Sequence, residues 1–115
     1  TLLENKFISG VKCLVFVDMQ VDVYDLKDVA WLVLNNMNPS RDIFIHEGVL
    51  IVDGTHKTKE FDGFDRPWPN VIVSDDDTIK AVDEKWPRLG LGEFIKSPSL
   101  KYKKLLWPGK AKAED

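Results

Sequence analysis

The 115 residues are enough for one domain, and a chain of this length can bury about two thirds of its unfolded surface in a core of its own. Its 16 basic and 19 acidic residues nearly balance, so we expect neither nucleic acid nor an anionic membrane as a partner. A single cysteine, Cys13, excludes an internal disulfide and a cysteine-rich metal site. Because no apolar run approaches the roughly 18 residues of a membrane span and the first residues show no signal-peptide pattern, we expect a cytoplasmic protein.

The first half of the chain predicts a strand followed by a helix. Residues 12–18 are a continuous run of strand-forming residues, typical of a strand covered on both faces, and Cys13 is expected to be buried within it. Asp25 is placed to cap a helix that starts at Leu26 and ends before Pro39. The residues expected to form its apolar face are Leu26, Val29, Ala30, Val33 and Met37.

Further strands are predicted at residues 42–46, 49–53 and 71–73. Ser74 and Asp77 match a capping box for a second helix, which Pro87 ends. A strand, a helix and another strand in succession form a right-handed βαβ unit. We therefore predict a single small α/β domain with a mostly parallel sheet and packed helices, covering residues 1–96.

Residues 97–115 differ in character from the rest of the chain. Ser97-Pro98 favours a short helix over residues 100–107. Its apolar residues fall on two sides, with Tyr102, Leu105 and Leu106 on one and Leu100 and Trp107 on the other. A helix this short needs packing to be stable, so it docks either on its own domain or on another chain. We expect a C-terminal docking tail that binds a partner.

Three segments suggest chemistry. The segment from Asp53 to Lys59 holds His56 beside carboxylates, which suits a metal, a general base or a bound phosphate, although a solvated polar loop is the simpler interpretation. Trp68, between two prolines, either pins its loop to the core or anchors an interface. The segment Val15-Phe-Val-Asp-Met-Gln-Val-Asp22 resembles the first strand of isochorismatase-like hydrolases, but their nucleophilic cysteine follows the aspartate, whereas Cys13 precedes Asp18.

Several stretches, taken in order, resemble the C-terminal domain of UbiD-type decarboxylases and carboxylases over roughly residues 11–95. The segment from Val17 to Trp31 resembles the family's strand, acidic loop and helix, and Asn38-Pro-Ser-Arg-Asp42 fits the turn that follows. Asp53-Gly-Thr-His-Lys57 resembles its Asp-Ala-Thr-x-Lys element, and Arg66-Pro-Trp-Pro69 and Trp86-Pro-Arg-Leu-Gly90 continue the match. The form of the Asp53 segment is most similar to the aromatic, phenylphosphate carboxylase-like branch.

The resemblance implies an enzyme that adds CO2 to, or removes it from, aromatic or unsaturated acids with prenylated FMN. The flavin, the metal ions and the catalytic residues belong to other domains of such enzymes, so we expect no catalytic residue, no metal site and no bound cofactor in this chain alone. Lys57 is the one residue that the resemblance places on the cofactor side. The short connection His46-Glu-Gly48 stands where the family carries a long loop towards the cofactor, which implies a structural role.

These implications predict an accessory or structural subunit bound to larger UbiD-like catalytic subunits. The expected interface residues are Trp68, Tyr102, Leu105, Leu106 and Trp107. Two alternatives stay open: a C-terminal fragment of a single-chain UbiD-type decarboxylase, and an isochorismatase-like hydrolase.

Overall fold

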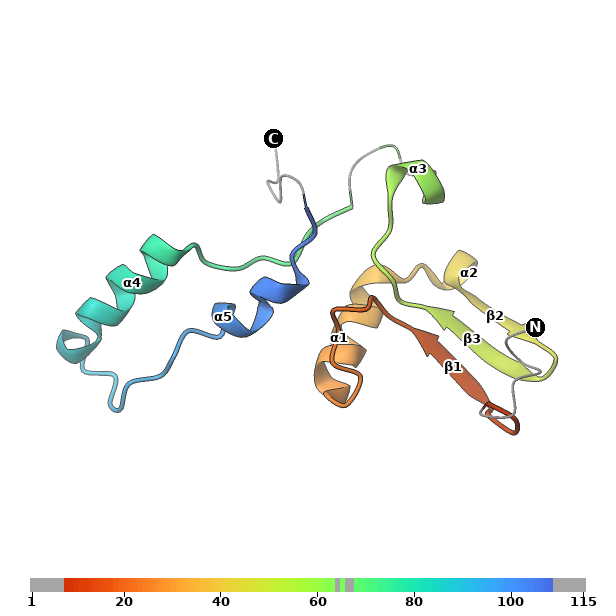
Figure 1. Ribbon diagram of the computed structural model, residues 1–115, viewed down its shortest axis with the longest axis horizontal. Coiled ribbons are helices and arrows are strands. Elements are labelled where there is room, and N and C mark those ends of the chain that lie inside the picture. The colour runs from red at the N-terminus through yellow and green to blue at the C-terminus, as the bar shows by residue number, and fades with distance from the viewer. Residues whose placement is uncertain (1–7, 64, 66–67, 109–115) are drawn as a thin grey trace. The chain divides into compact units, whose positions relative to one another are not determined.

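Three strands form the sheet of the N-terminal part of the chain, and the computed structural model describes residues 8–63, 65 and 68–108, without the side chains of Glu60 and Phe61. The strands are β1 (Cys13–Phe16), β2 (Ile43–His46) and β3 (Val49–Asp53), in the order β1-β3-β2. The central strand β3 pairs in parallel with β1 and antiparallel with β2 (Figure 1). The sheet is therefore mixed, with one parallel and one antiparallel pair, rather than mostly parallel as predicted.

The antiparallel pair follows from the two residues between β2 and β3. Glu47 and Gly48 both have positive φ angles, 49° and 77°, and this is the backbone of the tight turn that joins hairpin strands. Strands joined by two residues have to run antiparallel, because a parallel pair needs a crossover of a dozen or more residues. The parallel partner of β1 is thus β3, reached through a helix and β2.

The helix α1 (Leu26–Asn36) begins where predicted, since the Asp25 side chain accepts a hydrogen bond from the Asp28 backbone N–H. The face that it buries is rotated from the predicted one. Leu32, Val33 and Asn36 are buried, whereas Leu26 is exposed. The hydrogen bonds of Asn36, described below, fix this rotation, which apolar spacing alone does not reveal.

The core of this part lies between α1 and β3. Among its described residues, the buried apolar ones are Leu32 and Val33 of α1 and Val52 of β3, while several residues of the outer strands are exposed. Cys13 is among the exposed residues, so its predicted burial is wrong. Two short helices, α2 (Pro39–Asp42) and α3 (Lys59–Asp62), flank the strands β2 and β3 in the sequence.

The contacts within the chain divide it into two compact units, Thr1–Trp68 and Pro69–Asp115. The second unit contains α4 (Asp76–Lys85), the 3-10 turns η2 (Trp86–Arg88) and η3 (Lys103–Leu105), and α5 (Ser99–Tyr102) (Figure 1). Its buried apolar residues are Ile79 and Leu105. The boundary predicted after residue 96 separates the domain from a docking tail, and this boundary stays a prediction.

Two expectations for the second unit are wrong. Residues 71–73 have no strand partner in the described part of the chain and run as an irregular segment. The cap of α4 is Asp75, whose side chain accepts from the Thr78 backbone N–H at 2.7 Å, and not Ser74. Among the helices of the described residues, none is both long and apolar enough to cross a lipid bilayer.

Candidate functional site

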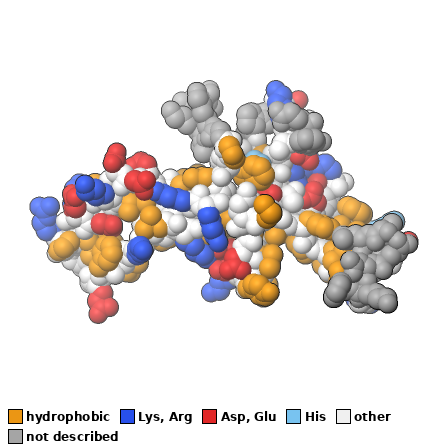
Figure 2. Space-filling view, in the orientation of Figure 1, with side chains coloured by type: hydrophobic (Ala, Val, Ile, Leu, Met, Phe, Trp, Pro, Cys, Tyr) orange, Lys and Arg blue, Asp and Glu red, His pale blue; other side chains and the backbone are white. Residues whose placement is uncertain are grey.

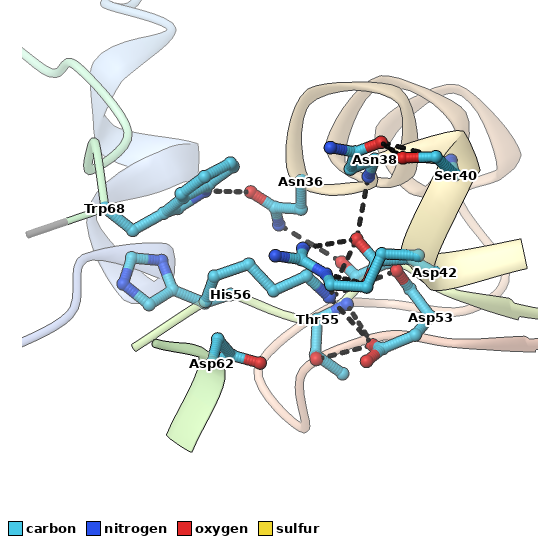
Figure 3. A network of polar contacts seen from close by, with 12 residues as sticks. Asn36, Asn38, Ser40, Asp42, Asp53, Thr55, His56, Asp62 and Trp68 are labelled. Carbon is cyan, nitrogen blue, oxygen red and sulfur yellow. Dashed lines mark hydrogen bonds and ion pairs between the residues drawn. The ribbon is translucent and has the colours of Figure 1, made fainter. Parts of the chain in front are cut away.

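Charged side chains gather where β3 ends and beside α2 (Figure 3). These side chains come from four segments of the chain: the loop after β1, the turn before β2, the end of β3 and the loop after β3. We call this group the charged cluster, and its members are Asp18, Arg41, Asp42, Asp53, His56 and Lys57.

Lys57 lies at the centre of the charged cluster. Its side chain is fully buried, and its Nζ lies 3.2 Å from the backbone oxygen of Asp53, 3.2 Å from Asp53 Oδ1 and 3.8 Å from Asp42 Oδ2. The two Asp53 oxygens lie within hydrogen-bond distance of the ammonium group, whereas Asp42 Oδ2 is farther away and forms an ion pair with it. Lys57 therefore ties the end of β3 to α2. The expected contact between Lys57 and a cofactor stays a prediction.

Asp42 is bound from two further directions. The guanidinium of Arg41 donates to both of its carboxylate oxygens at 2.6 Å, and the Asn38 backbone N–H donates to Oδ2 at 2.7 Å. The hydrogen bonds from Arg41 are the main cause that lowers the pKa of Asp42, and they outweigh the opposite effect of burial. Asp42 thus stays charged at neutral pH although it is buried.

Asp53 closes a local turn at the end of β3. Its Oδ1 accepts hydrogen bonds from the Thr55 backbone N–H at 3.0 Å and from the Thr55 hydroxyl at 2.6 Å. Burial alone raises the pKa of Asp53, but the hydrogen bonds from Thr55 and Lys57 outweigh it, so the pKa is lowered. The carboxylate is therefore the acceptor that holds both the turn and the lysine.

His56 joins the loop after β3 to the loop after β1. Its backbone N–H donates to Asp18 Oδ2 at 2.9 Å, across 38 residues of sequence. Burial lowers the pKa of the imidazole, and the carboxylates of Asp18 and Asp62 oppose this shift only in part. The imidazole is therefore neutral at pH 7. Asp62 itself accepts a hydrogen bond from the Thr58 backbone N–H at 2.6 Å, which fixes the start of α3.

Next to the charged cluster, Asn36 fastens α1 to two other segments. Its side-chain amide donates to the Gly54 backbone oxygen at 3.1 Å, and its Oδ1 accepts from the Trp68 indole N–H at 3.0 Å (Figure 3). A Cβ at Gly54 would lie 2.6 Å from Val33 Cγ2 and 2.9 Å from Val33 Cα. The absence of a side chain at residue 54 is therefore what lets α1 approach the end of β3 this closely.

Trp68 was predicted to pin its loop or to anchor an interface. Its bond to Asn36 shows the pinning contact, since it attaches the end of the first unit to α1. Its role in an interface stays a prediction. Arg66 and Pro67 of the same motif lie outside the described residues.

The predicted interface residues of the tail sit within the second unit, and residues 97–108 of the tail are described. Leu105 is buried, whereas Tyr102, Leu106 and Trp107 are half-buried. The side-chain oxygen of Asn70 accepts from the Trp107 backbone N–H at 3.1 Å, and its amide donates to the Trp107 oxygen at 3.0 Å. Lys103 also forms an ion pair with Asp76. This part of the tail therefore packs against its own unit.

The second unit also holds a pocket of about 230 Å³ between α4 and residues 95–98. Ile79, Val82 and Trp86 of α4 give it an apolar wall, and hydroxyl groups and one carboxylate lie beside that wall. The remaining lining residues are Ser74, Thr78, Asp83, Ile95, Ser97 and Pro98.

Metal binding finds no support in the described part of the chain, where no three His, Cys, Asp or Glu side chains are placed to hold an ion together. His56 and Asp62 lie near each other, but Asp62 is bound to the start of α3. The chemistry of the charged cluster is mutual neutralisation, in which each charge is held by an opposite charge or a backbone N–H.

Sequence reasoning singled out Lys57 and His56 but missed Arg41, Asp42 and Asn36. Asn38-Pro-Ser-Arg-Asp42 was recognised only as a turn. A signal was present, because an asparagine before a proline caps a helical turn, and the Arg-Asp pair at its end can form a local ion pair. That this pair meets Lys57 depends on the tertiary fold.

Comparisons with known proteins agree with this architecture. Residues 2–63, more than half of the chain, match the family UbiD_C, described as the 3-octaprenyl-4-hydroxybenzoate carboxy-lyase C-terminal domain. An uncharacterized protein of Aquifex aeolicus is 34% identical over 106 residues, covering 78% of this chain and 22% of the relative. One from Archaeoglobus fulgidus is 32% identical over 96 residues, covering 69% of this chain and 20% of the relative.

The chain thus spans about a fifth of the length of these curated relatives. The matched residues contain α1, all three strands and the whole charged cluster. From this match we conclude that the chain belongs to the UbiD C-terminal domain family.

Proposed function

We propose that the chain is an accessory, structural subunit of a UbiD-type carboxylase or decarboxylase that acts on aromatic acids. The family match supports this proposal, because it assigns the chain to the C-terminal domain of a carboxy-lyase. In the proposal the larger catalytic chains, with which this chain assembles in the cytoplasm, supply the reaction.

The observation that carries the structural role is the state of Lys57. Its ammonium group is buried and held by Asp42 and Asp53, which does not fit a lysine that binds a flavin phosphate. In the proposal, prenylated FMN and the metal ions are therefore held by the catalytic chain. The cofactor supplies the chemistry of CO2 transfer when it is bound there, whereas this chain supplies a charged, rigid domain.

The tail gives the proposal a second contact surface. Tyr102, Leu106 and Trp107 are half-buried within the second unit, so part of each side chain remains open to a partner. Trp and Tyr are frequent anchors of protein interfaces. We propose that these residues, together with Trp68, contact the catalytic chain, while buried Leu105 holds the tail on its own unit.

Expression of the chain with and without a UbiD-type catalytic polypeptide of the same organism, in cells that supply prenylated FMN, tests the proposal. We expect the chain alone to fold and to be colourless, and the complex to carry the flavin absorbance. Tyr102→Glu should weaken the complex, whereas Lys104→Glu, an exposed change in the same segment, should leave it intact. A stoichiometric flavin on the isolated chain would contradict the proposal.

A second candidate is the C-terminal part of one long UbiD-type polypeptide. It is favoured by the relatives, which are about five times as long as the segment that matches this chain. Immunoblotting of the source cells against this chain separates the two candidates. A band at 13.2 kDa favours the subunit, and a band several times larger favours the single polypeptide.

A further inference from the structure

The apolar face of α1 extends beyond the residues that it buries. Leu32 and Val33 face the core, together with Asn36. Next to this buried face, Leu26, Ala30 and Leu34 follow each other at intervals of four residues and form one stripe. Leu26 is 74% exposed and Leu34 is 69% exposed. A helix that is apolar around most of its circumference is normally buried on both sides.

The residues around this stripe extend it into a larger apolar surface. The loop before α1 adds Met19, which is 97% exposed, and Tyr24, which is 92% exposed. Figure 2 shows hydrophobic side chains at the surface near α1. We call this region the α1 outer surface, and its residues are Met19, Val23, Tyr24, Leu26, Ala30 and Leu34.

Its composition is that of an interface. A single fully buried aromatic side chain covers about 150–250 Å², and the α1 outer surface contains one aromatic residue, Tyr24, beside five aliphatic ones. Monomeric proteins rarely expose contiguous apolar patches of more than a few hundred Å². Tyr and Trp are also the residues that most often dominate binding energy in protein contacts.

The charges beside the α1 outer surface limit what can cover it. Asp22 lies in the exposed loop before α1, and Lys27 lies among the apolar residues because it shares a face of α1 with Ala30 and Leu34. A complementary partner therefore offers an apolar surface that also carries polar groups for Asp22 and Lys27.

We infer that the α1 outer surface docks on the catalytic part of a UbiD-type polypeptide, an inference that rests on the function proposed above. The relatives contain about four fifths of their length outside the matched segment, and the matched family is a C-terminal domain. In such proteins this domain therefore shares a chain with a much larger body. Contacts between domains of one chain commonly bury about 600–1,500 Å², and exposed apolar residues such as those of the α1 outer surface are what such contacts cover.

The test uses two variants in the same turn of α1. Leu34→Glu places a charge on the α1 outer surface, and Asn35→Glu places the same charge on the neighbouring exposed residue outside it. Binding of the full chain to the separately expressed UbiD-type catalytic polypeptide of the same organism is measured by calorimetry. We expect Leu34→Glu to raise Kd at least about tenfold and Asn35→Glu to change it less than about twofold.

A thiol label at Leu34→Cys, in a Cys13→Ser background, shows what covers the surface. We expect rapid labelling in the isolated chain and at least about tenfold slower labelling in the complex. Slow labelling in the isolated chain, at any concentration, means that the chain itself covers the surface and overturns the inference. Slow labelling that appears only at high chain concentration means self-association and overturns it as well.

The two proposals can fail separately. If the unmodified chain binds the catalytic polypeptide and Leu34→Glu binds equally well, the docking surface is wrong and the proposed subunit stands. If the unmodified chain does not bind at all, the proposed subunit is wrong and the docking surface fails with it.

Discussion

Replacing Lys57 with methionine removes the cation at the centre of the charged cluster while keeping most of its volume. The ammonium group is 3.2 Å from Asp53 Oδ1 and 3.8 Å from Asp42 Oδ2, and its side chain is fully buried. Removal of one partner from a buried ion pair costs about 3–5 kcal/mol, because the remaining charge loses its compensation.

The expected loss is smaller here. Asp42 keeps its hydrogen bonds from Arg41 and Asn38, and Asp53 keeps those from Thr55 and is 40% exposed. We therefore expect Lys57→Met to lower the free energy of unfolding by about 2–3 kcal/mol. For a cooperative unit of this size, 1 kcal/mol corresponds to roughly 4–8 °C in Tm, so Tm should fall by at least roughly 8 °C.

Thermal and urea unfolding of the full chain, followed by circular dichroism, measures this loss. Lys59→Met is the matched control, because it removes the same charge from an exposed residue two positions away, and it should change stability by less than about 0.5 kcal/mol. If Lys57→Met melts within a degree or two of the unmodified chain, the buried ion pairs do not stabilise the fold and our description of the charged cluster is wrong.

Three further changes test neighbouring parts of the first unit. Gly54→Ala should lower the free energy of unfolding in urea by about 1–3 kcal/mol, because the new Cβ meets Val33. Adding Val33→Ala should restore only part of the loss, since Val33 Cα itself lies 2.9 Å from that Cβ. Equal stability of Gly54→Ala and the unmodified chain would show that α1 is not held this closely. Asp25→Ala should cost about 0.5–2 kcal/mol through loss of the α1 cap, whereas Gln20→Ala, in the exposed loop before α1, serves as its control. Burial lowers the pKa of His56 in the folded chain, so as pH falls the imidazole is protonated first in the unfolded chain, and stability should decline below about pH 6.5. His56→Gln should remove this decline. The variant should keep the second decline in stability, below about pH 4, which comes from the lowered pKa values of Asp42 and Asp53. A pH profile of His56→Gln identical to that of the unmodified chain would exclude this role of the imidazole.

The elements that sequence reasoning located correctly carry local signals. Asp25 precedes a run with helical spacing, and its carboxylate caps α1 as predicted. The strand-forming runs gave all three strands of the sheet within one or two residues. These signals depend on neighbours in the sequence, which is why they can be recognised without a structure.

The errors concern relations between segments that are far apart. The antiparallel pairing of β3 with β2 depends on the positive φ angles of Glu47 and Gly48, and a glycine between two strand-forming runs was a sign of that hairpin. The rotation of α1 depends on Asn36, a polar residue that is buried because Gly54 and Trp68 complete its hydrogen bonds. A spacing rule that counts only apolar residues cannot detect such a contact.

The charged cluster shows the same limit. Lys57 was singled out because its segment resembles a family element, and its ammonium group lies at the end of β3, bound to Asp53. The two carboxylates that bind it lie 4 and 15 residues before it in the sequence, and only the fold brings the more distant one near. The choice between an exposed lysine that binds a ligand and a buried one that holds the fold therefore needed coordinates.

The most direct test of the proposed subunit is native mass spectrometry of the assembly purified from the source organism through an affinity tag on this chain. The proposal predicts a complex in which the 13.2 kDa chain is bound at fixed stoichiometry to a larger UbiD-type polypeptide that carries a flavin. Recovery of the 13.2 kDa chain by itself, with no larger UbiD-type polypeptide, would contradict it.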